Sequence, residues 1–234
     1  MLGLAAGIGA ALVFAGYHTM APESQLYGES FVGTSPDRRE IALTFDDGPN
    51  DPYTLQLLEV LANAGVRATF FMVGRYVDAR PDIARAVADA GHVVGNHTYT
   101  HPNLIFQSQW QLRDEVERCD RALHDAVGDR ATKLFRPPFG GRRPATMRTL
   151  RAMGMIPIMW NVTGFDWDAK SHVSIERHVE KKVHGGNVVL LHDGGHLAFG
   201  TDRACTVAAT RNIVKRYKDE GYTFRTIPEM MGGM

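Results

Sequence analysis

The stretch from Ile41 to Asn50, IALTFDDGPN, decides how the rest of the chain is interpreted. An apolar run that closes on a Gly-Pro pair is typical of a buried strand that ends in a turn. Asp46 and Asp47 then lie at the carboxyl end of this strand, where α/β folds place their chemistry. Because successive strand residues point to opposite faces, one carboxylate could bind a metal ion while the other stays free as a base. Asp-Asp-Gly-Pro is also good turn composition, so a function needs support from the remaining sequence.

Downstream of this strand, short apolar runs alternate with helical patterns as far as Ile227. We expect helices at 53–64, 81–90, 110–127, 144–153, 171–183 and 203–220, and further strands at 68–74, 93–94, 133–136, 155–162, 187–191 and 222–227. This alternation predicts an α/β fold with a parallel sheet and helices outside it. With about seven strands the sheet should close, or nearly close, as a barrel, and the strand ends should then share one mouth.

Length and charge limit the classes of protein that need to be considered. A chain of 234 residues suits one large α/β domain with a substantial core. The formal net charge is zero, so charge gives no support for nucleic acid or an anionic membrane surface as a partner. Cys119 and Cys205 lie far apart without a CxxC spacing, so a disulfide and two separate thiols both stay open.

The first residues form an uncharged apolar run rich in Ala and Gly, from Leu2 to Tyr17. The run is shorter than the ~20 residues of a full membrane span, and no basic segment of a secretory signal precedes it. We interpret residues 1–20 as a signal or membrane-anchor segment of an exported, cell-envelope protein, in preference to a buried core helix. Residues 21–38 would be a polar linker, and residues 39–230 the folded catalytic domain.

Two histidines separated by three residues, His97 and His101 in HTYTH, follow a predicted strand end. On a helix this spacing presents both imidazoles to one zinc ion, but here Pro102 follows at once, so we expect a loop or a single turn. One such pair is weak evidence. Together with Asp47 it supplies three N and O ligands, the number that leaves a position open for water in a catalytic metal site.

Other polar residues gather at the same predicted mouth. Arg136 needs a carboxylate partner there, and either Asp46 or Asp166 would serve. The Pro-Pro-Phe-Gly turn after it is rigid enough to direct the Phe139 N–H towards a developing oxyanion. An exposed arginine on a rigid loop is the alternative.

Aromatic residues and one more histidine follow. Trp160 and Trp167 flank a strand end, where their faces would suit sugar rings, although core packing is the commoner use of Trp. His192 ends the apolar run NVVLL. Taken alone it would be structural, but opposite a metal-activated water it would be the natural general acid.

These segments resemble the motifs of the NodB-homology polysaccharide deacetylases, carbohydrate esterase family 4. In chain order they are TFDDG at 44–48, HTYTH at 97–101, RPPFG at 136–140, DW at 166–167 and LLH at 190–192. The resemblance spans roughly residues 41–227. Each motif is short, but five in the right order at plausible spacing are highly specific.

The resemblance implies a distorted (β/α) barrel that removes acetyl groups from N-acetylated sugars with the help of a metal ion. Asp47, His97 and His101 would bind the ion, usually zinc, although cobalt and other divalent ions suit the same ligands. The other implied roles are general base for Asp46, general acid for His192, orientation of Asp46 for Arg136, and contact with the acetyl methyl for Trp167 and Leu190.

One position departs from the family pattern. The fourth motif usually begins with an Asp three residues before that of the DW pair, and here this position is Thr163. The resemblance implies that this carboxylate pairs with the catalytic histidine and raises its pKa. We therefore expect His192 to be a weaker acid, or to use Asp166 or Asp193 in its place.

The function expected from the sequence is N-deacetylation of an N-acetylglucosamine-containing polysaccharide, with peptidoglycan first and chitin-like oligomers second. The alternatives are an O-acetyl esterase on an acetylated glycan and a catalytically impaired carbohydrate-binding protein of the same fold. A glycosidase needs two carboxyl groups about 5–9.5 Å apart across the sugar, and the adjacent Asp46 and Asp47 beside a histidine pair fit a metal better.

Overall fold

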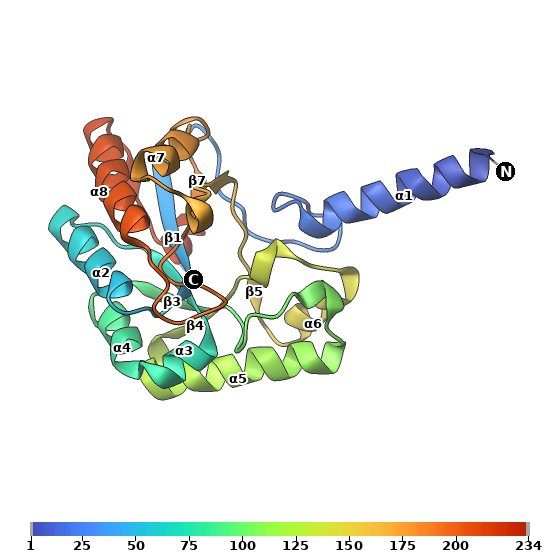
Figure 1. Cartoon of the computed structure of the whole chain (residues 1–234), viewed down its shortest axis with the longest axis horizontal. Helices are drawn as coiled ribbons and strands as arrows, with labels where there is room; N and C mark the ends of the chain where they lie inside the picture. The colour runs from blue at the N-terminus through green and yellow to red at the C-terminus, as the bar shows by residue number, and fades with distance from the viewer. Residues whose placement is uncertain (1, 233–234) are drawn as a thin grey trace.

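The fold is built on one parallel sheet with β1 near its centre (Figure 1). The computed structural model describes residues 2–232. Neighbouring strands follow the order β5-β4-β3-β2-β1-β7-β6, and β8 pairs with the first residues of β1. The strands are β1 (Glu40–Gly48), β2 (Thr69–Met72), β3 (Val93–Asn96), β4 (Ala131–Phe135), β5 (Ile156–Pro157), β6 (Val162–Thr163), β7 (Asn187–His192) and β8 (Thr223–Phe224). The expected parallel α/β architecture is therefore confirmed.

Helices surround this sheet (Figure 1). They are α1 (Leu2–Met20), α2 (Tyr53–Ala64), α3 (Gly74–Ala79), α4 (Pro81–Asp89), α5 (Gln109–Val127), α6 (Pro144–Ala152), α7 (His172–Glu180), α8 (Ala204–Asp219) and α9 (Ile227–Met230). Helix α2 has the predicted bounds and ends at Gly65, whose φ of 63° is the left-handed conformation that glycine adopts without strain. Ser108 begins α5 with a capping box, and the Ser171 hydroxyl caps α7.

The barrel is distorted because its two edge strands, β5 and β6, are short. The segment that joins them is irregular and runs from one edge of the sheet to the other. The sequence predicts one strand over 155–162, which is wrong: two-residue strands stand at either end of that range. Between them the Ile158 N–H donates to a carbonyl of β4 and the Asn161 N–H to one of β7, so the chain crosses from one edge of the sheet to the other. Phe31 from the N-terminal segment bridges to Ile158 and fills the gap.

Two other expectations about elements need correction. The last predicted strand, 222–227, shortens to Thr223–Phe224. Thr226 caps α9 there, and the Ile227 N–H donates to the Thr69 hydroxyl. The predicted strand over 68–74 ends at Met72, and Gly74 begins the short helix α3.

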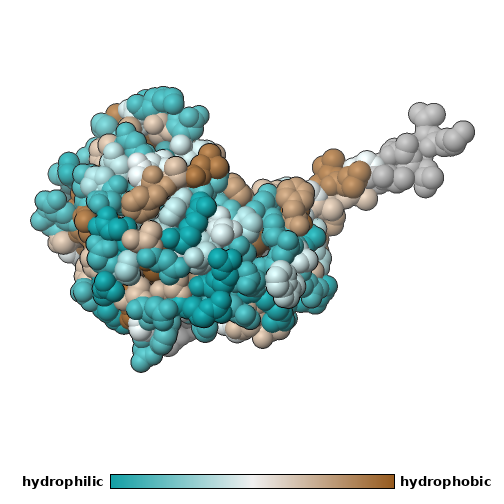
Figure 2. Space-filling model, turned by 60° about the horizontal axis from the view of Figure 1, so that its bottom comes forward, coloured by the Kyte–Doolittle hydropathy of each residue, from teal (hydrophilic) through white to brown (hydrophobic). Residues whose placement is uncertain are grey.

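The N-terminal helix α1 extends away from the barrel (Figure 1). Apolar side chains remain exposed along it, among them Leu12, Val13 and Phe14, and they form the brown surface of the projection in Figure 2. Over residues 2–232, the structure contains no helix with both the length and the apolarity that crossing a membrane requires.

The segment predicted as a linker, 21–38, is attached to the barrel. Gly33 bridges to Asn187 of β7, and the Thr34 N–H donates to the Gly186 carbonyl. The buried guanidinium of Arg142 donates to carbonyls of Ala21, Pro22 and Ser24. The ordered body of the protein therefore includes residues before Arg39.

The core lies on both faces of β1. Ile41, Leu43 and Phe45 are fully buried against the outer helices, whereas Ala42 on the opposite face contacts a second apolar cluster. Both cysteines are free thiols, with Cys119 buried under the sheet.

Candidate active site

The carboxyl ends of β1, β3, β4 and β7 meet around one pocket of about 460 Å³. The expected site residues that line it are Asp46, Asp47, His97, His101, Phe139, Trp167, Leu190 and His192. They come from segments far apart in the chain, because parallel strands present their carboxyl ends at the same edge of a sheet. The convergence expected at one mouth is observed.

A bulge at the end of β1 brings both carboxylates into this pocket. Simple alternation along a strand predicts that Asp46 and Asp47 face opposite sides, and this is wrong. The register of β1 with β2 shifts between Asp46 and Gly48, and Asp47 has a φ of 73°. As a result, both carboxylates approach His97, whose Nε2 is 3.7 Å from Asp46 Oδ2 and 3.6 Å from Asp47 Oδ1.

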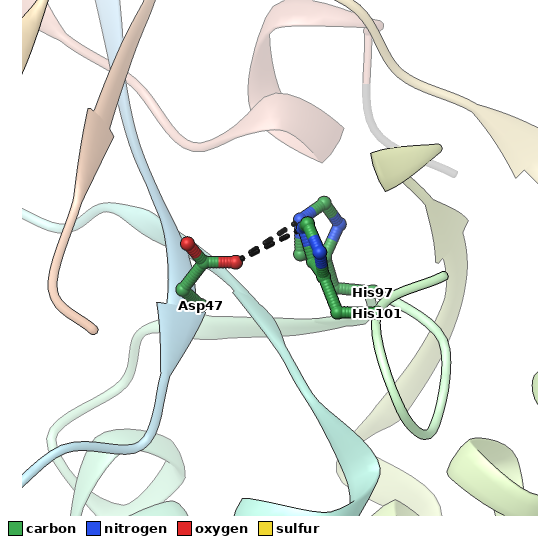
Figure 3. Close-up of side chains that lie close together, drawn as sticks. All are labelled: Asp47, His97 and His101. Carbon is green, nitrogen blue, oxygen red and sulfur yellow. Dashed lines mark ion pairs between the residues drawn. The ribbon is translucent and has the colours of Figure 1, made fainter. Parts of the chain in front are cut away.

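Asp47, His97 and His101 point towards one another (Figure 3). One donor atom from each lies within 4.8 Å of the other two, and His101 Nε2 is 3.2 Å from Asp47 Oδ1. The His97 Nδ1–H donates to the Arg136 carbonyl over 2.8 Å, which leaves the Nε2 lone pair directed at Asp47. Within residues 2–232, Asp47 Oδ1 has no hydrogen-bond donor.

The electrostatics of these three residues suit a cation. Burial lowers the pKa of His97 to about 3 and that of His101 further, so both imidazoles are neutral and have lone pairs to offer. Burial also raises the pKa of Asp47 to about 6, and the charges of His192 and Arg203, which lower it, do not offset burial and the nearby Asp46 carboxylate. Two neutral imidazoles and a carboxylate with an unpaired oxygen form a donor set that fits a divalent metal ion.

Asp46 adjoins this set but is bound by Arg136. The Arg136 Nη1 donates to Asp46 Oδ1 over 2.7 Å and to the Thr44 hydroxyl, while carbonyls of residues 158 and 159 take its other donors. The guanidinium is fully buried, and its carbon lies 4.2 Å from the centre of the Phe71 ring. Of the two carboxylates expected as its partner, the structure places Asp46 there. Burial raises the pKa of Asp46 above its usual range despite this cation.

The histidine on the other side of the pocket pairs with Asp166. His192 Nδ1–H donates to Asp166 Oδ1 over 2.8 Å, and its backbone N–H to Oδ2 over 2.7 Å. The Thr206 hydroxyl donates to the same Oδ2. Burial alone would lower the pKa of His192, but the charge and hydrogen bond of Asp166 raise it to about 9. Burial alone would raise the pKa of Asp166, but the His192 charge and these hydrogen bonds bring it below its usual value.

Of the two outcomes expected from Thr163, the structure has the second: His192 uses Asp166, and it is not a weaker acid. Thr163 lies on β6 beside Leu190, and the carboxylate that reaches the imidazole is the one that opens the DW pair. Asp193, the other substitute considered, accepts from the Thr54 hydroxyl instead. Of the two acids expected as substitutes, Asp166 is therefore the one that pairs with His192.

The remaining expected residues form the pocket walls. Phe139 has a φ of 57°, and its ring packs edge-on against His101 with 4.8 Å between centroids. Leu190 is buried at the pocket base, whereas Trp167 is half exposed and meets His192 edge-on at 5.5 Å.

Sequence reasoning missed the loop that follows His192. His196 stacks on His101 with 4.9 Å between ring centroids and lies 5.1 Å from the Phe139 ring. Leu197, next along the loop, is 86% exposed at the pocket rim. The Arg75 guanidinium donates to the His196 carbonyl and fixes the loop. The signal in the sequence is a histidine four residues after His192 in a Gly-rich stretch, the fourth histidine at this mouth.

Comparisons with known proteins agree with this geometry. The family model described as polysaccharide deacetylase matches residues 33–158, more than half of the chain. A peptidoglycan-N-acetylglucosamine deacetylase of Bacillus cereus is 34% identical over 206 residues, which cover 87% of this chain and 72% of that protein. A chitooligosaccharide deacetylase of Sinorhizobium fredii is 35% identical over 195 residues, covering 81% of this chain and 90% of the relative.

Solved structures lead to the same group. The crystal structure of a peptidoglycan N-acetylglucosamine deacetylase, in complex with a hydroxamate-type benzamide, superposes with a TM-score of 0.80 at 32% identity. The match covers 88% of this chain and 93% of that one. Sequence family, relatives and fold agree, and the chain belongs to the polysaccharide deacetylase family.

Proposed function

We propose that this protein is a metal-dependent hydrolase that removes N-acetyl groups from an N-acetylglucosamine-containing polysaccharide and releases acetate. The observation that supports it most is the separation of tasks within one pocket. Three residues are grouped so that they could hold a metal ion, the adjacent Asp46 is bound through its Oδ1 by Arg136, and His192 is paired with Asp166 on the other side. A base, an acid and an ion site are the groups that hydrolysis of a stable amide requires.

The reaction follows from where these groups hold protons. A divalent ion bound by Asp47, His97 and His101 would acidify a water molecule and polarise the acetamide carbonyl. Asp46 then accepts the water proton, since its pKa is raised and only its Oδ1 is taken by Arg136. His192, protonated at neutral pH, gives its proton to the departing amine as the C–N bond breaks. The products are acetate and a free amino sugar.

We assign the pocket walls to the acetyl group and the sugar. Leu190 and Trp167 would contact the acetyl methyl, and the Phe139 N–H would donate to the oxyanion that forms on the carbonyl. The exposed faces of Trp167 and Phe139 at the rim suit the apolar faces of pyranose rings.

We propose zinc as the ion and peptidoglycan as the first substrate to test. A site of two imidazoles and one carboxylate is typical of catalytic zinc, although cobalt and other divalent ions bind such ligands too. The relatives named above are deacetylases of peptidoglycan and of chitooligosaccharides, so chitin-like oligomers are the second substrate.

The experiment is acetate release from peptidoglycan and from N-acetylglucosamine oligomers, with and without chelator, alongside elemental analysis. Asp46→Asn should abolish turnover and retain the ion, because Asn can still accept from Arg136 and the three proposed ligands, Asp47, His97 and His101, are unchanged. The His97→Ala variant should lose both turnover and the bound ion. Loss of the ion from the Asn variant would refute this division of roles.

The same assay separates the alternatives. Acetate release from O-acetylated xylan alone would identify an esterase. Tight oligosaccharide binding without any acetate release would identify a carbohydrate-binding protein. Catalysis is favoured because a raised-pKa carboxylate and a protonated histidine would both be unnecessary for binding alone.

We also propose that the protein acts at the cell envelope, since that is where a peptidoglycan substrate lies. Residues 1–20 would be its signal or membrane-anchoring segment, followed by the connector and the catalytic domain at 39–230. Cell fractionation tests this: recovery with membranes that only detergent reverses would support contact through the N-terminal segment, and recovery in the cytoplasm would contradict export.

A further inference from the structure

The loop that carries both metal-site histidines has an unfavourable backbone conformation. Thr98 has a φ of 65° and His101 a φ of 61°, so two residues other than glycine occupy the left-handed region within four positions. This region is unfavourable for L-residues, and for a β-branched threonine in particular. Such a loop keeps its shape only if surrounding groups hold it there.

The Glu115 side chain from α5 holds the middle of this loop. Its Oε2 accepts from the N–H groups of Tyr99 and Thr100 over 2.9 and 2.7 Å. Its Oε1 accepts from the Thr100 hydroxyl over 2.6 Å. Glu115 is buried, which is uncommon for a glutamate unless its oxygens are fully used.

The contacts on either side of Glu115 complete the support. The Asn96 side chain accepts from the Thr98 N–H, and the Thr98 hydroxyl accepts from the His101 N–H. On the outer side, N–H groups of α3 donate to the carbonyls of residues 98 and 99. Among the described residues, Glu115 is the side chain that binds two of the three N–H groups between the histidines, those of Tyr99 and Thr100.

We propose that Glu115 is a positioning residue for the metal site: it fixes the turn between His97 and His101 and thereby sets the affinity for the ion. This inference rests on the proposed metal-binding function. Glu115 is neither a ligand nor a residue lining the pocket. It acts through the backbone, since a loop that relaxes from the left-handed conformation at residue 101 would turn the His101 imidazole away from Asp47.

The hydrogen bonds that Glu115 accepts from Tyr99 and Thr100 predict which substitution at position 115 is tolerated. The amide oxygen of Glu115→Gln can accept from both N–H groups, and its NH₂ can donate to the Thr100 hydroxyl. The glutamine therefore keeps all three hydrogen bonds and loses only the negative charge. Glu115→Ala leaves two N–H groups without an acceptor and an empty space beside the loop.

The test is a metal titration of the metal-free proteins with Zn²⁺ against a chromophoric chelator, and with Co²⁺ followed by its visible spectrum. We expect the Gln variant to bind within about threefold of the wild type and the Ala variant to bind about 10- to 100-fold more weakly, the usual effect of losing support for a ligand. A changed Co²⁺ spectrum in the Ala variant would report altered ligand geometry.

Glu229→Ala is the matched control. Glu229 also accepts from a backbone N–H and a hydroxyl, both of Thr226, but it does so near the start of β1, away from the site. The Glu229→Ala substitution should lower the denaturation midpoint and leave the affinity for the metal ion unchanged. An equal loss of affinity in this control would overturn the proposal, because general destabilisation would then explain the Ala result.

The outcomes also separate this inference from the proposed function. Wild-type protein that binds neither ion would refute the metal site itself. Wild-type protein that binds, with Glu115→Ala binding equally well, would overturn the role of Glu115 and leave the function intact. If Glu115→Ala does not fold, Thr100→Val removes one contact; a loss of about threefold is then expected, and unchanged affinity refutes the proposal.

Discussion

Replacing Asp166 with Asn tests whether His192 is the acid of the reaction. The substitution keeps the shape of the side chain and can preserve one hydrogen bond, but it removes the charge that holds the His192 proton. Burial, the largest single influence on this pKa, is then opposed only by the weaker effects of the Asp47 and Asp46 charges, and we expect the histidine pKa to fall from about 9 in the wild type to its ordinary 6.5 or less.

The magnitude follows from these two values. A fall from about 9 to 6.5 or less is at least 2.5 pH units, or about 3 kcal/mol at 1.36 kcal/mol per unit. At pH 7.5 the wild-type histidine is almost fully protonated, whereas at most about a tenth of the variant is. Turnover should therefore fall at least about tenfold at pH 7.5, and by about a further tenfold for each pH unit above that until the wild type itself loses its proton.

The assay is acetate release as a function of pH, between 5.5 and 9.5, with the ion supplied in excess. The descending limb of the profile should move to lower pH in Asp166→Asn. Asp168→Asn, two residues away on an exposed side chain, is the control and should leave the profile unchanged. A penalty in Asp166→Asn that is the same at pH 6 and pH 8.5 would show that Asp166 acts on geometry alone and not on the His192 proton.

Two further predictions concern stability. Arg136→Met should lower the free energy of unfolding by about 3–5 kcal/mol, because Asp46 is left buried without its cation; urea denaturation measures it, and a loss below about 1 kcal/mol would contradict the pairing. His92 accepts from the Ala68 N–H, and its burial lowers its pKa to about 4 from 6.5. The unfolded chain therefore binds a proton that the folded protein excludes, and stability should fall as pH drops from 6.5 to 4, by about 2 kcal/mol after allowing for partial solvent access. His92→Gln should flatten that dependence in metal-free protein, and an unchanged slope would assign it to other groups.

Features with a local cause could be predicted from the sequence. The apolar run before Asp46 predicts the buried strand, and Gly65 ends α2 where the sequence places its end. The histidine pair and Asp47 also meet as expected. Their segments follow β3 and β1, two strands of one parallel sheet with β2 between them, and parallel strands end at the same edge.

Features set by distant contacts could not be predicted. The strand expected over 155–162 breaks because its middle bonds to distant groups: the Ile158 and Asn161 N–H groups donate to carbonyls of β4 and β7, and the carbonyls of residues 158 and 159 accept from Arg136. The Asp47 bulge depends on the register of β1 with β2. Glu115 resembles any polar residue of an amphipathic helix until the loop of Tyr99 and Thr100 is placed against it.

The sequence by itself determined the alternation of strands and helices, the family and the residue types available at the mouth of the barrel. Only the tertiary structure decided which carboxylate pairs with which basic side chain. Asp46 pairs with Arg136, and Asp166 pairs with His192, 26 positions away in the chain. The reason is physical. Hydropathy periods and turn residues act over a few neighbours, whereas a buried charge takes whichever partner the packed fold brings within hydrogen-bond distance.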